Sequence, residues 1–214
     1  MTWTNIAMDT YLAPHMSELK TADIPDRSNA VAASEAWLTR FTLKAMFQIN
    51  LPAQVRQYLF MFIRRSAATA RLHAQARALT LEFLAKNSNE QPALMLYTRA
   101  IDCWDAFLAQ GWQATVFWSF IIERPREIFT GSESSFARLN GLHNDGKHAE
   151  SRIEAGELSA DSTFTMWMTP AGLVSAKHSL TWLETAELVD CLQVWNQVIE
   201  RDLDDAAARH AQGT

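Results

Sequence analysis

Glycine and proline are scarce in this sequence, with 7 and 6 residues among 214. Tight turns depend on these two residues, so the chain has too few of them for the many turns of an all-β fold. An apolar content of 48% and a charged content of 20% are typical of a globular protein, not of a disordered one. Eight Trp and eleven Phe supply enough aromatic surface to dominate a core.

Cysteine and long apolar runs are also lacking. Cys103 and Cys191 are the only cysteines and form no Cys-x-x-Cys pair, so we expect both to be reduced and buried. The longest apolar run, residues 58–63, ends at Arg64 and is far too short to span a membrane. The first 20 residues lack the basic start and apolar run of a signal peptide. We therefore expect a soluble cytoplasmic protein with no membrane partner.

Apolar residues at helical spacing predict three long helices in the first half of the chain, at residues 28–49, 52–86 and 91–123. Arg124-Pro125 ends the third of these. The spacing of Thr130 and Glu133 is that of a capping box, which predicts that a fourth helix begins at Thr130.

Residues 162–182 change in character, because threonines alternate with apolar residues at the period of a β-strand. With a turn at 169–172, this segment predicts a small two-stranded hairpin. Thr181 and Glu184 form a second capping box, which opens a last helix whose tail, 206–214, should fray. The predicted fold is mainly α: one domain over residues 1–214, a bundle of five or six helices with a β-hairpin before the last.

The charges are unevenly distributed among the predicted helices. The helix at 52–86 is rich in arginine, whereas the last helix is acidic. The two helices could simply be neighbours or have solvated faces. Alternatively, the basic helix binds RNA phosphates, with Arg64 and Arg71 as contacts, inside a protein whose formal net charge is −5.

The stretch RLNGLHNDGKHAESRIEAG crowds polar and basic side chains into one predicted helix. Asn140, Asn144 and His148 are four residues apart and would form one stripe, flanked by His143 and Lys147. This set could supply amide groups, a general base near neutral pH and a cation for handling phosphate. Asn and Gly are poor helix formers, so their number here has a cost, which favours a functional role over a merely solvated face.

The segment HNDGKHAE resembles the helix motif of HEPN-type proteins, helical-bundle domains often found in prokaryotic toxins and defence systems. The nuclease members of this family use an Arg, a polar residue that is often Asn, and a His, with four to six residues between the Arg and the His. The longer pattern, with MWMTPAGL after it, is also similar to a group of small uncharacterised bacterial proteins. The resemblance implies a protein of stress or phage defence that binds or cleaves RNA, without a metal ion if it cleaves.

Two registers of this motif compete. In the first, Arg138 and His143 are the Arg and the His, but Leu139 replaces the polar residue. In the second, His148 ends the motif after Asn144, and His143 occupies the Arg position, where an imidazole is a weaker cation. A nuclease with this second register would be degenerate or would rely on Arg138 or Lys147.

The sequence therefore leaves two functions open. One is a HEPN-like protein that binds or cleaves RNA, with His148, Asn144, His143, Arg138 and Lys147 as catalytic candidates and Arg64, Arg71 and Asn140 as RNA contacts. The other is a non-catalytic helical module that forms a homodimer or docks a partner protein. No metal site or cofactor is predicted, since the chain has neither the spacing of metal ligands nor a Gly-rich phosphate loop.

Overall fold

The computed structural model describes residues 3–47, 51–87, 94–129, 131, 134–156 and 163–212. In these residues the structure has α-helices α1 (Trp3–Tyr11), α2 (Asn29–Phe47), α3 (Ala53–Asn87), α4 (Leu94–Ile121), α5 (Ser135–Lys147), α6 (Ala149–Glu154) and α7 (Trp182–Gln212). Two short 3-10 helices are η1 (Met16–Glu18) and η2 (Arg126–Phe129), and the strands are β1 (Met166–Met168), β2 (Gly172–Ser175) and β3 (Ser179–Thr181). The prediction of a mainly helical fold with strands just before the last helix is confirmed.

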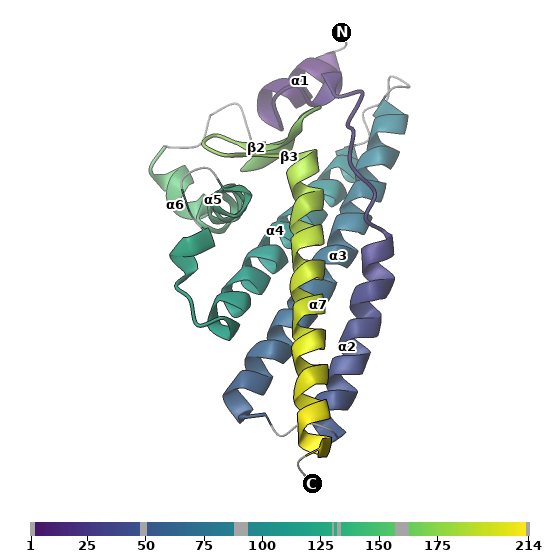
Figure 1. Cartoon of the computed structure of the whole chain (residues 1–214). Helices are drawn as coiled ribbons and strands as arrows, with labels where there is room; N and C mark the ends of the chain where they lie inside the picture. The colour runs from purple at the N-terminus through teal and green to yellow at the C-terminus, as the bar shows by residue number, and fades with distance from the viewer. Residues whose placement is uncertain are drawn as a thin grey trace.

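Four long helices, α2, α3, α4 and α7, lie side by side as an elongated bundle (Figure 1). The sheet and α1 cover one end of this bundle, and α5 packs beside α4. The described part has seven α-helices, not five or six, because α1 was not predicted and the helix after residue 134 is divided into α5 and α6. None of the described helices has the length and hydropathy that a membrane span needs.

Ion pairs join α2 to α7 along their length. Arg27 donates two hydrogen bonds to Asp190, at 2.7 and 2.8 Å. Further along, Arg40 pairs with Glu200 at 2.8 Å, and Lys44 pairs with Asp204. Three acidic side chains of the last helix therefore pair with α2 or with Arg27 just before it, and not with the arginine-rich helix α3.

The strands form a three-stranded antiparallel sheet in the order β1-β2-β3, not the two-stranded hairpin expected. The predicted turn is confirmed: Thr169 and Gly172 close it with an N–H to carbonyl bond of 2.8 Å. The third strand is only three residues long, Ser179–Thr181, and pairs with Gly172–Val174. Three residues give too little alternation to reveal a strand in the sequence.

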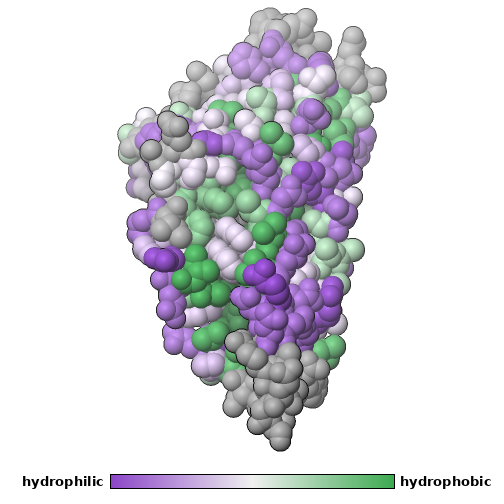
Figure 2. All heavy atoms as spheres, in the orientation of Figure 1, coloured by the Kyte–Doolittle hydropathy of each residue, from purple (hydrophilic) through white to green (hydrophobic). Residues whose placement is uncertain are grey.

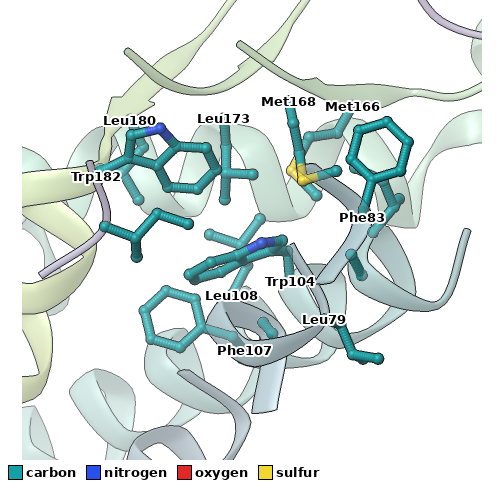
Figure 3. Packing of buried hydrophobic residues seen from close by; sticks show 14 of the residues in the cluster. Leu79, Phe83, Trp104, Phe107, Leu108, Met166, Met168, Leu173, Leu180 and Trp182 are labelled. Carbon is teal, nitrogen blue, oxygen red and sulfur yellow. The ribbon is translucent and has the colours of Figure 1, made fainter. Parts of the chain in front are cut away.

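The sheet is fixed to the bundle by a core of large side chains (Figure 3). Trp104 of α4 is fully buried, and its indole N–H donates to the hydroxyl of Thr80 at 3.0 Å. On the other side its ring lies 5.3 Å from that of Trp182, between centroids. Leu173 and Leu180 of the sheet are also fully buried here. This packing holds β2 and β3 in place above α4 and beside α5.

The last helix begins as predicted. The Thr181 N–H donates to the Glu184 carboxylate at 2.8 Å, and the Glu184 N–H donates to the Thr181 hydroxyl at 3.2 Å, which is a capping box. α7 continues to Gln212, and the fraying expected from residue 206 stays a prediction. Three alanines at 206–208 favour helix in this segment, and residues 213–214 lie outside the described part.

Cys103 and Cys191 are unpaired thiols, as expected. They are half-buried and not fully buried as expected. Partial burial raises the pKa of both thiols, and neighbouring carboxylates add to that rise.

Candidate functional site

Helix α5, which carries the predicted site, is capped by Ser134. The Ser134 hydroxyl accepts the N–H of Ala137 at 3.0 Å, and the helix begins at Ser135. The predicted capping box placed this start at Thr130. Thr130 and Glu133 lie outside the described residues, and the later start assigns the cap to Ser134 instead.

The helix does not continue through His148 as expected. α5 ends at Lys147 and α6 begins at Ala149, with His148 between them at φ −106° and ψ 24°. The His148 N–H still donates to the carbonyl of Asn144 at 3.0 Å, so His148 stays within one turn of it. The Asn144 side-chain amide donates to Asn140 at 3.2 Å. These two asparagines therefore form the expected stripe, and His148 lies exposed at its end.

His143, Lys147 and His148 lie within electrostatic range of one another. Burial lowers the pKa of His143, the carboxylate of Asp105 opposes this shift, and the charges of Lys147 and His148 add to it. Asp105 comes from α4 and was not predicted. Packing around its carboxylate raises the pKa of Asp105, while nearby His143 lowers it. The structure thus brings together three of the candidates and adds one acidic group.

Arg138 lies on a different side of α5 and already forms an ion pair. Its guanidinium forms an ion pair with Glu184 of α7, and the other carboxylate oxygen of Glu184 accepts the N–H of Thr181. The charge of Arg138 is therefore largely balanced inside the protein.

Asp145 is the centre of a polar network that the sequence did not reveal. Its side chain is only 1% exposed. One carboxylate oxygen accepts the hydroxyl of Ser175 and lies 3.0 Å from Nδ1 of His178, while the other pairs with Arg152. Burial alone would raise the pKa of Asp145, but the hydrogen bonds from His178 and Ser175 outweigh it and hold this pKa below its ordinary value.

At two glycines of α5, the lack of a side chain allows a neighbouring element to pack closely against the helix. A Cβ atom on Gly141 would lie 2.4 Å from Cδ2 of His178, and one on Gly146 would lie 3.0 Å from Oδ1 of Asp105. The first distance is too short for a side chain unless the ring moves, and the second is a tight contact that a small shift of Asp105 would relieve. Gly141 and Gly146, together with the buried Asp145, therefore serve to dock α5 on the sheet and on α4. No local sequence signal could distinguish this role from a catalytic one.

The arginines of α3 divide into two groups. Arg65 donates to Gln110 of α4 at 2.7 Å, and Arg77 donates to the Ile24 carbonyl at 2.8 Å. Arg64 and Arg71 are exposed and form no ion pair with any residue in the described ranges. They are exposed on α3, whereas the other candidates lie on α5, which packs against α4, α7 and the strands.

Two cavities lie away from α5. One, of about 380 Å³, is between the start of α3 and the end of α4, next to Tyr58 and Phe120. The other, of about 360 Å³, is between the N-terminal segment and the β1–β2 turn, next to His15 and Trp167. Within the described residues, no three His, Cys, Asp or Glu side chains are grouped so as to hold a metal ion.

No protein-family model, curated protein or solved structure matches this chain. The resemblance of α5 to the HEPN motif therefore stays a prediction from the sequence.

Proposed function

We propose that this protein binds RNA and cleaves it without a metal ion, using the exposed side of α5. The position of His148 carries this proposal. Its side chain is exposed at the end of α5, one turn from Asn144 and within electrostatic range of Lys147 and His143. An imidazole can move a proton near neutral pH, an amide can hold a phosphate oxygen, and an ammonium group can offset developing charge.

The resemblance to the HEPN nuclease motif favours the same chemistry and suggests a setting in stress or phage defence. His148 would transfer the proton, and Asn144, held by Asn140, would position the phosphate. Since Glu184 balances Arg138, the cation next to the reacting phosphate would be Lys147, with His143 beside it.

The exposed arginines of α3 support the binding half of the proposal. In a protein of formal net charge −5, exposed cations that pair with none of the described residues leave a local positive surface. Three acidic residues of α7 do not neutralise it, because they pair with Arg27, Arg40 and Lys44. Arg64 and Arg71 would therefore contact RNA phosphates on α3. Asn140 would contact a polar group of the RNA on α5.

Salt dependence tests RNA binding. Each lost phosphate contact on a single strand reduces the slope of log affinity against log salt by about 0.7, because fewer counterions are released. The double variant Arg64→Ala/Arg71→Ala should therefore lower the slope by roughly 1.4. Arg40→Ala, which removes an exposed arginine already paired with Glu200, should leave the slope unchanged. Binding that ignores salt, or equal slopes for both variants, would rule out this interface.

A second candidate function is a protein-interaction module, favoured by an apolar patch on α7. Figure 2 shows apolar groups gathered beside charged ones on the face that α7 presents in Figure 1. Leu183 and Val194 of α7 are more than half exposed. If the patch binds a second copy or another protein, Val194→Glu should lower the mass of the complex in solution and leave RNA binding intact. An unchanged mass would remove this candidate.

A further inference from the structure

The strongest unassigned feature is the pair of His178 and Asp145. His178 lies in the turn between β2 and β3, and Asp145 lies on α5, so they are distant in sequence. The Nδ1 atom of His178 is 3.0 Å from a carboxylate oxygen of Asp145. That oxygen is an acceptor only, so the proton of a neutral imidazole must be on Nδ1. The Nε2 atom is then left unprotonated, and it has no hydrogen-bond partner among the described residues.

The His178 ring is positioned by Asp145 and by the surface of α5 at Gly141. Asp145 is itself held by Ser175 and Arg152, so its carboxylate has little freedom. Gly141 allows the imidazole to lie directly against α5, where any Cβ atom would collide with it. The His178 side chain nevertheless remains 36% exposed. The arrangement combines a fixed, oriented imidazole with access from solvent.

Closing the turn does not require the imidazole. The Ser175 hydroxyl accepts the N–H of His178 at 3.0 Å, and the Ser175 N–H donates to the His178 carbonyl at 2.8 Å. The Ser175 hydroxyl also reaches Asp145 and ties the turn to α5. A smaller residue at position 178 could therefore keep all of these bonds, and the ring itself contributes only its contacts with Asp145 and Gly141.

We propose that His178, positioned by Asp145, is the base that activates the attacking group of an RNA phosphodiester, with His148 as the acid. This assignment rests on the proposed RNA cleavage. Asp145, which holds His178, is three residues before His148, and the His148 N–H donates to the Asn144 carbonyl, so His148 lies within one turn of the C-terminal end of α5. Asp145 would orient the imidazole and stabilise the imidazolium that forms, as carboxylates do for catalytic histidines in general.

The step balances with these two imidazoles. Nε2 of His178 takes the proton from a ribose 2′-hydroxyl, and the 2′-oxygen forms a bond to phosphorus. The bond from phosphorus to the 5′-oxygen breaks, and protonated His148 gives its proton to that oxygen. The products are a 2′,3′-cyclic phosphate and a free 5′-hydroxyl, and exchange of protons with water restores both histidines.

An activated substrate separates the two roles. Uridine 3′-(4-nitrophenyl phosphate) releases 4-nitrophenolate, a leaving group that needs no acid, whereas an RNA oligonucleotide releases an alkoxide that does. His148→Ala should therefore lose activity on RNA by about 100-fold or more but keep most of its activity on the activated substrate. His178→Ala should lose about 100-fold on both. His15→Ala, which removes an exposed histidine that also contacts a carboxylate, is the matched control and should change neither.

Asp145→Asn tests the positioning role through the pH profile. Wild-type activity on RNA should be bell-shaped in pH, because one imidazole must be neutral and the other protonated. Loss of the Asp145 carboxylate should lower the rate per folded molecule across this profile, because the imidazole is no longer oriented, whereas a purely structural role would lower only the folded fraction.

Several results would overturn the assignment. The assignment is wrong if His178→Ala has wild-type activity, or if His148→Ala and His178→Ala lose equal activity on the activated substrate. If His178→Ala is unfolded, His178→Gln retains a donor for Asp145, and a folded, active His178→Gln would also overturn it. If the wild type cuts neither substrate, RNA cleavage fails and the assignment fails with it. If only the His178 variants behave like wild type, RNA cleavage stands and this assignment alone is wrong.

Discussion

The two sides of α5 differ in how they are connected to the rest of the protein. On the inner side, Arg138, Asp145 and the glycines contact α7, the sheet and α4 through ion pairs, hydrogen bonds and close packing. On the outer side, Lys147 and His148 are exposed. Poor helix formers occur on both sides, but only those of the inner side are explained by docking. The cost of an unfavourable helix residue therefore indicates function only after its tertiary contacts are known.

Substitutions on the two sides of α5 should differ most in their effect on the free energy of unfolding. Asp145→Ala removes a buried carboxylate and leaves His178, Ser175 and Arg152 without their shared partner. We expect a loss of about 3 kcal/mol in the free energy of unfolding. Asn144→Ala, the next residue along, should change it by less than about 0.5 kcal/mol. Urea denaturation of both variants measures this difference, and equal losses would contradict the contrast between the two sides.

Histidines offer the same contrast between buried and exposed positions. His73 is fully buried beside Trp104, and burial, reinforced by Arg27 and Arg77, lowers its pKa to about 4, although Asp26 and Asp190 oppose the shift. The unfolded chain binds a proton near pH 6.5, so this neutral histidine stabilises the fold fully above that pH.

That stability should be lost as the pH falls from about 6.5 to about 4, by roughly 3 kcal/mol in total. Chemical denaturation at a series of pH values, in wild type and in His73→Leu, isolates this contribution. The variant should lack this part of the pH dependence, whereas replacement of the exposed His15 by Gln should retain it. If His73→Leu loses as much folding stability as the wild type when the pH falls, His73 does not cause that loss.

Gly141→Ala should have a smaller effect on the inner side. The new methyl group would collide with the His178 ring, and moving that ring should cost about 1–3 kcal/mol. Gly131→Ala is the matched control, because a Cβ atom there meets nothing within 4 Å. Thermal unfolding compares the two, and a Gly141→Ala protein as stable as wild type would mean that the imidazole is not held against α5.

The sequence predicted the features that depend on neighbouring residues. The long helices α3 and α7 follow from apolar periodicity, and the capping box of Thr181 and Glu184 was recognised from its spacing. The features it missed join distant segments. Asp145 meets His178, and Arg138 meets Glu184, only when the sheet and α7 pack on α5. The break at His148 was missed too, because a helical pattern continues on both sides of it.

Cleavage and stability measured together in His148→Ala test most directly whether the outer side of α5 performs chemistry. Because the side chain is exposed, we expect the variant to unfold at the wild-type temperature. Its cleavage of a single-stranded RNA in the presence of EDTA should be lost, by about 100-fold or more. Full RNA cleavage by a folded His148→Ala protein, or a wild type that cuts RNA only when a metal ion is supplied, would contradict the proposed function.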